Sequence, residues 1–223
     1  MKEALIIGGT GDIGSAVIDE LKKDYNITFT YCNNQEKAKQ VEGTCYQFDF
    51  SMNIKNALND MVEKIGDLDV LVTAAFPFMM ADAFDINGYE KIEPYLRSYL
   101  SINSLAAKKM NDDGKLINII GSSANLGSGK APYSAACYAF IDNWAKGANA
   151  SYGKNGGVQV CNLLLGPVET KRWNGLSEEL RAKYDSDVRE FLKPTDVAKY
   201  VRNIVDSPIV PTSIVIDSFN SLR

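Results

Sequence analysis

Short apolar runs recur along the chain, and longer stretches between them carry an apolar residue every three or four positions. The runs are typical of buried strands, and the longer stretches are typical of amphipathic helices. The pattern predicts strands at residues 4–7, 27–32, 45–48, 70–72, 116–120, 158–165 and 213–216. It predicts helices at residues 13–23, 34–41, 54–65, 89–110, 133–152, 177–191 and 195–205.

Strands and helices alternate, and the strands are apolar on both faces. This combination predicts an α/β fold of the Rossmann type, a doubly wound parallel sheet of about seven strands with helices on both faces. No linker or repeat divides the sequence, so we expect one domain over residues 1–223. The longest loops, 76–88 and 166–177, should leave the carboxyl edge of the sheet, where ligands bind in such folds.

Composition removes several classes of function. The net charge is −4 without a basic run, so nucleic acid is not an expected partner. No apolar run reaches the roughly 20 residues needed to span a membrane. The four cysteines lack C-x-x-C spacing, so we expect no disulfide framework, no metal site and a cytoplasmic setting. The chain has no histidine, which excludes a Ser-His-Asp triad.

A glycine-rich turn joins the first predicted strand to the first predicted helix. Gly8, Gly11 and Gly14 are spaced three residues apart. In a dinucleotide site such glycines allow a tight turn, a close approach of backbone to pyrophosphate and close packing of helix on strand. A plain turn is the alternative. The position after the first strand favours dinucleotide binding, through Gly8, Thr10, Gly11, Asp12, Ile13 and Gly14.

The end of the second predicted strand bears on which dinucleotide is bound. An acidic residue there would bind the ribose 2′-hydroxyl of NAD, but the segment Tyr31 to Asn34 carries no carboxylate. The amides of Asn33 and Asn34 can donate to a 2′-phosphate, and Lys37 lies one helical turn further on. We therefore expect NADP, with NAD as the second choice. The alternative is that Asn33 and Asn34 only cap the following helix.

Taken together, these residues resemble the short-chain dehydrogenase/reductase family over essentially the whole chain, especially its 3-oxoacyl-carrier-protein reductase-like members. The resemblance implies one dinucleotide-binding domain that includes a substrate loop at about 166–190. It implies catalytic roles for Tyr133, Ser122 and Asn103, with Ser122 preferred over Ser123. It also implies further cofactor contacts from Asp49, Phe50, Ala74, Ala75, Gly166, Val168 and Thr170.

The chain departs from the family pattern at three places. It reads Thr73-Ala74-Ala75-Phe76 where the family usually reads Asn-Asn-Ala-Gly, and it has Asp12 where many members have glycine. The lysine expected four residues after the tyrosine is Cys137. Cys137 is either a nucleophile or a small buried helix residue. The missing positive charge could come from Lys130, Lys171 or Arg172.

The resemblance implies an NADP-dependent reductase of ketones or 3-oxoacyl thioesters. Tyr133 would donate the proton, Ser122 would orient the carbonyl oxygen, and Asn103 would hold a water or the helix geometry. Each of these residues also has an ordinary structural alternative. Two other functions stay open: a dehydratase, isomerase or lyase on this scaffold, and a catalytically impaired subunit that binds a dinucleotide or a partner. The family pairs through the helices at 89–110 and 133–152, so we expect a homodimer or homotetramer.

Overall fold

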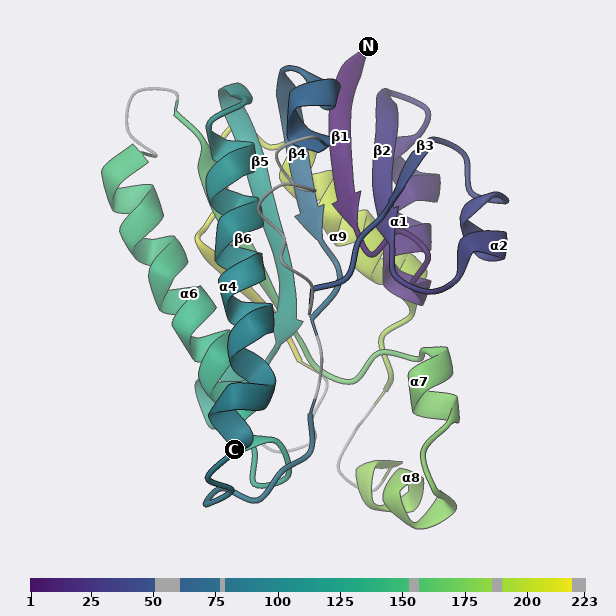
Figure 1. Ribbon diagram of the computed structural model, residues 1–223, viewed down its shortest axis with the longest axis vertical. Coiled ribbons are helices and arrows are strands. Elements are labelled where there is room, and N and C mark those ends of the chain that lie inside the picture. The colour runs from purple at the N-terminus through teal and green to yellow at the C-terminus, as the bar shows by residue number, and fades with distance from the viewer. Residues whose placement is uncertain (51–60, 77–78, 153–156, 186–189, 218–223) are drawn as a thin grey trace.

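Seven parallel strands form one sheet in the order β3-β2-β1-β4-β5-β6-β7 (Figure 1). This computed structural model describes residues 1–50, 61–76, 79–152, 157–185 and 190–217. The strand order reverses between β1 and β4, which is the topological switch point where such sheets bind ligands. The strands are β1 (Lys2–Ile7), β2 (Tyr25–Tyr31), β3 (Thr44–Gln47), β4 (Leu68–Thr73), β5 (Met110–Gly121), β6 (Gln159–Leu165) and β7 (Ser213–Ile216).

Helices cover both faces of the sheet, as the alternating pattern predicted. On one face, α1 (Asp12–Leu21) packs beside α9 (Pro194–Asp206). On the other face, α4 (Gly88–Ala107) packs beside α6 (Pro132–Tyr152). The shorter helices are α2 (Gln35–Ala38), α5 (Ser123–Leu126), α7 (Lys171–Asn174) and α8 (Glu178–Asp185).

Side-chain alternation along the strands divides the apolar residues into two cores. In β1, Ala4 and Ile6 face the core under α1 and α9, whereas Leu5 and Ile7 face the core under α4 and α6. All four residues are buried. A strand with apolar residues on both faces must be covered by helices on both sides, and β1 accordingly lies inside the sheet between β2 and β4.

Three predicted helices differ from the structure at their ends. The helix predicted for 89–110 ends at Ala107, because Met110 pairs with Leu68 and opens β5. This strand pairing outweighs the helical spacing of apolar residues. The helix predicted for 34–41 is the shorter α2. Of the helix predicted for 54–65, residues 61–65 are helical, and residues 51–60 lie outside the described part of the chain.

The segment after β6 is divided more finely than its apolar spacing predicted. A single helix was expected over 177–191, but two helices, α7 and α8, are present and α8 ends at Asp185. Residues 190 and 191, at the end of the predicted helix, are not helical, and the next residue, Leu192, forms a parallel bridge with Val168. The bridge draws residues 190–193 alongside the chain that leaves β6, which excludes a helix there.

Candidate active site at the carboxyl edge of the sheet

A cavity of about 410 Å³ opens at the carboxyl ends of β1 to β4. It brings together six of the residues predicted to bind a cofactor, and its remaining lining is largely aromatic. The predicted residues are Gly8, Asn33, Asp49, Phe50, Ala74 and Ala75, and the others are Thr30, Tyr31, Cys32, Phe48, Phe76 and Tyr95.

The glycine turn borders this cavity through Gly8. Gly8 has a φ of 86°, a conformation that favours glycine. A Cβ added at Gly14 would lie 2.2 Å from the carbonyl oxygen of Gly8, so the helix can approach the turn only without a side chain. Gly11 is the N-cap of α1. The first-turn N–H groups of a helix have no partner within the helix, so this turn can hold an anion.

Two polar side chains connect the glycine turn to neighbouring segments by hydrogen bonds. The carboxylate of Asp12 accepts a hydrogen bond of 2.6 Å from the backbone N–H of Lys171, the first residue of α7. The ammonium group of Lys37 donates a bond of 2.6 Å to the carbonyl oxygen of Thr10. The predicted loop residues Thr10 and Asp12 therefore link the turn to α2 and α7. Neither residue lines the cavity.

The two asparagines after β2 have different surroundings. Asn33 lines the cavity, whereas the side-chain oxygen of Asn34 accepts a bond of 2.9 Å from the N–H of Lys37 and caps α2. The capping alternative therefore describes Asn34. Nearby, burial raises the pKa of the Cys32 thiol and the negative charge of Asp49 raises it further, so this thiol is protonated at neutral pH.

Tyr133 lies in the first turn of α6, where its hydroxyl is held by the loop before α4. The hydroxyl donates a bond of 2.6 Å to the carbonyl oxygen of Asp85. A Cβ added at Gly88 would lie within 2.1 to 2.6 Å of three ring atoms of Tyr133, so loop and ring are in close contact. The loop is also fixed by a bond of 2.9 Å from the N–H of Met79 to the Ser134 hydroxyl.

Asp85 and Lys91 are neighbours of Tyr133 that the sequence did not indicate. The Lys91 ammonium lies 2.8 Å from the Asp85 carboxylate. Its pKa is raised by the hydrogen bond to Asp85, then by the charge of that carboxylate, with a smaller effect of Tyr133. Asp85 thus binds both the phenol and a cation. Because six residues separate Asp85 from Lys91 and 48 separate it from Tyr133, no local motif joins the three.

The other predicted catalytic residues lie close to the sheet. Ser122 is buried at the end of β5, and its N–H donates to the carbonyl oxygen of Leu165. Asn103 is fully buried on α4, where its amide donates a bond of 2.9 Å to the carbonyl oxygen of Tyr99. That bond is the structural alternative foreseen for Asn103. Its side-chain oxygen has no hydrogen-bond partner among the described residues.

Cys137 faces the protein interior one turn after Tyr133. Its side chain is buried, and burial raises the pKa of the thiol to about 11. A thiol with this pKa is protonated at neutral pH and is a poor nucleophile. Cys137 therefore has the properties of the small buried helix residue.

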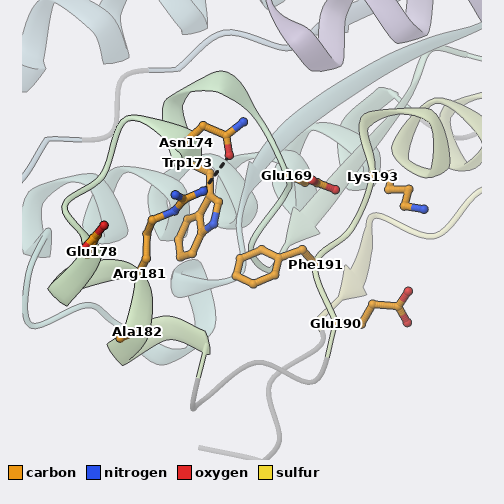
Figure 2. Close-up of a pocket in the computed structure, with 9 residues that line it drawn as sticks. All are labelled: Glu169, Trp173, Asn174, Glu178, Arg181, Ala182, Glu190, Phe191 and Lys193. Carbon is orange, nitrogen blue, oxygen red and sulfur yellow. Dashed lines mark hydrogen bonds between the residues drawn. The ribbon is translucent and has the colours of Figure 1, made fainter.

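The segment after β6 forms the wall of a second cavity of about 530 Å³. Gly166 donates its N–H to the carbonyl oxygen of Ile216, and Thr170 is the N-cap of α7. Figure 2 shows the ring of Phe191 next to that of Trp173 in the lining of this cavity. The two rings are in contact, with centroids 4.5 Å apart. Its lining also includes Glu169, Asn174, Glu178, Arg181, Ala182, Glu190 and Lys193.

The described residues contain neither a membrane-spanning helix nor a cluster of metal-ligating side chains. No helix among them has both the length and the apolar character needed to cross a bilayer. Among the same described residues, no group of three or more histidine, cysteine, aspartate or glutamate side chains could hold a metal ion.

Comparisons with known proteins agree with this geometry. The chain is 30% identical over 181 residues to the cyclic-di-GMP-binding biofilm dispersal mediator protein of Escherichia coli K12, covering 76% of this chain and 74% of that protein. The crystal structure of BdcA in complex with NADPH superposes with a TM-score of 0.87 at 23% identity, over 100% of this chain and 96% of that one. A short-chain dehydrogenase from Burkholderia cenocepacia J2315 in complex with NADP superposes with a TM-score of 0.85 at 22% identity, over 97% and 96%. The family model for short chain dehydrogenases matches residues 2–181, and the chain belongs to this family.

Proposed function

We propose that this protein is an NADP-dependent oxidoreductase that reduces the carbonyl group of a ketone or 3-oxoacyl thioester. The observation that carries the proposal is the cavity beside the glycine turn, at the switch point of a parallel sheet. Family membership supports an oxidoreductase. Two proteins of the same fold were crystallised with NADPH or NADP.

The residues around the cavity fit this cofactor. The cradle between Gly8 and Gly14 has no room for a Cβ at either glycine, as expected for the tight turn and the close packing of helix on strand in a dinucleotide loop. The amides of Asp12 and Ile13 would receive the phosphates, because the N–H of Gly11 already donates to the carbonyl oxygen of Gly8. The aromatic lining would receive the adenine. Asn33 and Lys37 would donate to the 2′-phosphate, for which Lys37 would exchange its bond to Thr10. When bound, the cofactor supplies the hydride.

Tyr133 would supply the proton to the carbonyl oxygen. A neutral phenol can donate a proton, and this hydroxyl already donates to the Asp85 carbonyl. During reduction it would exchange that acceptor for the substrate oxygen, which Ser122 would orient. The family lysine is replaced by Cys137, and Lys91 is the cation held by the same Asp85. We therefore favour Lys91 over Lys130, Lys171 and Arg172 as the charge that supports Tyr133.

The segment at about 166–190 would serve as the substrate loop of a single domain over residues 1–223. The cavity between α7, α8 and residues 190–193 supports this assignment, because it gives the loop a concave surface next to Thr170.

Activity can be tested by following the absorbance of the reduced cofactor with a panel of small ketones and 3-oxoacyl thioesters. We expect NADPH consumption with at least one substrate. The Tyr133→Phe variant should lower the rate by about 10²- to 10⁴-fold, the range of general acid–base catalysis. The matched control is Tyr200→Phe on α9, where the side chain is exposed and has no role in the proposed site or assembly. No consumption with any substrate would reject the reductase.

A second candidate is a nucleotide-binding protein without turnover. The engagement of the Tyr133 hydroxyl by Asp85 favours it. The similarity to the cyclic-di-GMP-binding biofilm dispersal mediator protein of Escherichia coli also favours it. Calorimetry with NADPH and with cyclic di-GMP separates the candidates. Binding of either ligand without NADPH consumption would favour the binding protein, and NADPH binding with turnover would favour the enzyme.

We also propose a homodimer or homotetramer in a cytoplasmic setting. Large apolar side chains are exposed on both long helices, with Tyr89 on α4 and Phe140 and Tyr152 on α6. All four cysteines are free, which supports a reducing compartment. Light scattering after size-exclusion chromatography would give the mass, and a monomer would contradict the proposed assembly.

A further inference from the structure

Phe76 stands at one end of the candidate nucleotide cavity. It follows the end of β4 by three residues and lines the cavity with Ala74 and Ala75. Its ring packs edge-on against Tyr138 of α6 and Tyr99 of α4, with centroids 5.2 and 5.8 Å away. Both tyrosines are buried, so the two contacts fix the Phe76 ring at this end of the cavity.

The contacts of Phe76 continue toward the predicted catalytic serine. The ring of Tyr138 lies against Gly121, where an added Cβ would be 2.9 Å from a ring carbon of Tyr138. Gly121 directly precedes Ser122. On the other side of Phe76, Ala75 lies close to the glycine turn. A Cβ added at Gly8 would be 2.7 Å from the Cβ of Ala75. The contacts from Gly8 to Ala75, from Phe76 to Tyr138 and from Tyr138 to Gly121 thus form one continuous wall.

The lining of the cavity stops at this wall. Among the described residues, its lining comes from the carboxyl ends of β1, β2, β3 and β4 and from Tyr95 of α4. Ser122, Tyr133 and Thr170, which the family resemblance places at the nicotinamide, do not line it. The volume of about 410 Å³ is near the lower end of the roughly 300–1,000 Å³ of small-molecule sites.

The chemistry inside the cavity suits one planar base with its sugar. Phe48 and Phe50 pack edge-on with centroids 5.3 Å apart, and Phe50 lies 6.2 Å from Tyr95. Such rings offer apolar faces to a purine. Asn33 and Asp49 supply polar contacts beside them. The site therefore matches the adenosine half of a dinucleotide.

We propose that Phe76 determines ligand length at this site. With its ring on Tyr99 and Tyr138, the cavity takes an adenosine phosphate of mononucleotide size. A dinucleotide enters fully only when the ring leaves these contacts, which weakens its binding relative to the mononucleotide. The inference deepens the proposed function, because it rests on NADP as the cofactor of this cavity.

Calorimetry with NADPH and with adenosine 2′,5′-bisphosphate, which lacks the nicotinamide half, tests the proposal. The proteins are the wild type, Phe76→Ala and the control Phe84→Ala, whose ring is 95% exposed. We expect Phe76→Ala to bind NADPH about tenfold more tightly, which corresponds to about 1.4 kcal/mol. Its affinity for the bisphosphate should stay within about twofold of wild type, because the loss of one ring at the cavity edge leaves the base site intact. Phe84→Ala should match wild type with both ligands.

Two other results would overturn the proposal. Equal NADPH affinity of the wild type and Phe76→Ala, with both ligands bound, would overturn the role of Phe76 and leave the proposed cofactor in place. No binding of either ligand to any of the proteins would overturn the proposed cofactor and this inference with it. If Phe76→Ala does not fold, Phe76→Leu carries the same test, with a gain for NADPH between those of the wild type and the alanine variant.

Discussion

The hydroxyl of Tyr133, at the start of α6, donates a hydrogen bond of 2.6 Å to the backbone carbonyl of Asp85, just before α4. A carbonyl is the kind of acceptor that a carbonyl substrate would offer. The same contact also occupies the phenol until a substrate oxygen replaces it. The docking of the loop 79–88 on α6 therefore decides where the candidate proton donor points.

Gly88→Ala tests this docking. The new methyl group would lie within 2.1 to 2.6 Å of the Tyr133 ring, and overpacking of this kind costs about 1–3 kcal/mol. We expect the free energy of unfolding in urea to fall by that amount, together with the rate of carbonyl reduction. Gly147→Ala on α6 is the control, because its methyl group meets open space and alanine favours a helix. An unchanged stability of Gly88→Ala would contradict the close contact.

Asp12→Ala tests the link between the glycine turn and α7. The Asp12 carboxylate accepts the backbone N–H of Lys171. Because the bond is exposed, we expect only about 1 kcal/mol or less in global stability. The sharper readout is hydrogen exchange, since the amides of residues 171–174 should exchange faster in Asp12→Ala. Ser15→Ala, which removes a bond within the same helix turn, is the control. Equal exchange in the three proteins would show that Asp12 does not hold α7.

Lys37→Met tests the preference for NADP over NAD. Loss of the ammonium group should weaken NADPH binding about tenfold or more, because a charge-assisted bond to a phosphate is lost. Binding of NADH, which has no 2′-phosphate, should change little. Lys39→Met is the matched control, since Lys39 pairs with Glu36 on the outer side of α2. Calorimetric affinities for both nucleotides give the result, and equal losses for NADPH and NADH would exclude Lys37 as the 2′-phosphate contact.

Asp142 makes the stability of the fold depend on pH in the acid range. Burial alone would raise the pKa of this carboxyl group, but hydrogen bonds from Lys146, Ser213 and Asn162 outweigh burial and lower it. A carboxyl group whose folded pKa is depressed stabilises the fold above its unfolded pKa, about 3.9. That stabilisation is lost as the pH falls through the folded pKa. Urea midpoints measured from pH 7 to pH 3 should fall less steeply for Asp142→Asn than for wild type. Parallel slopes would contradict the assignment.

Local sequence was sufficient for the regular parts of the fold. The strand predicted at 213–216 is β7 without any change of bounds, and the helix predicted at 133–152 differs from α6 by one residue. Both elements have a clear local boundary, since Pro132 opens α6 and Pro211 lies just before β7. The end of α4 was misplaced because pairing of Met110 with Leu68, 42 residues away, decides it. The helix α7 was missed because its N-terminus is held by Asp12, 159 residues earlier.

In the candidate site, too, local sequence patterns indicate some residues, whereas others depend on contacts between distant segments. Gly8 and Gly14 were found from their spacing, since the turn that requires them is local. Asp85 and Lys91 could not be found, because their relation to Tyr133 depends on how a long loop docks on another helix. The direction of the Phe76 ring likewise depends on Tyr99 and Tyr138, which no short motif connects with it.

The most direct test of the central claim is a crystal structure of the protein grown with saturating NADP. We predict the adenine among Phe48, Phe50 and Tyr95, and the pyrophosphate against the amides of Asp12 and Ile13. We also predict the Tyr133 hydroxyl facing the nicotinamide after release from Asp85. A cavity that stays empty under these conditions, or a bound nucleotide with Tyr133 still pointing away from it, would contradict the account.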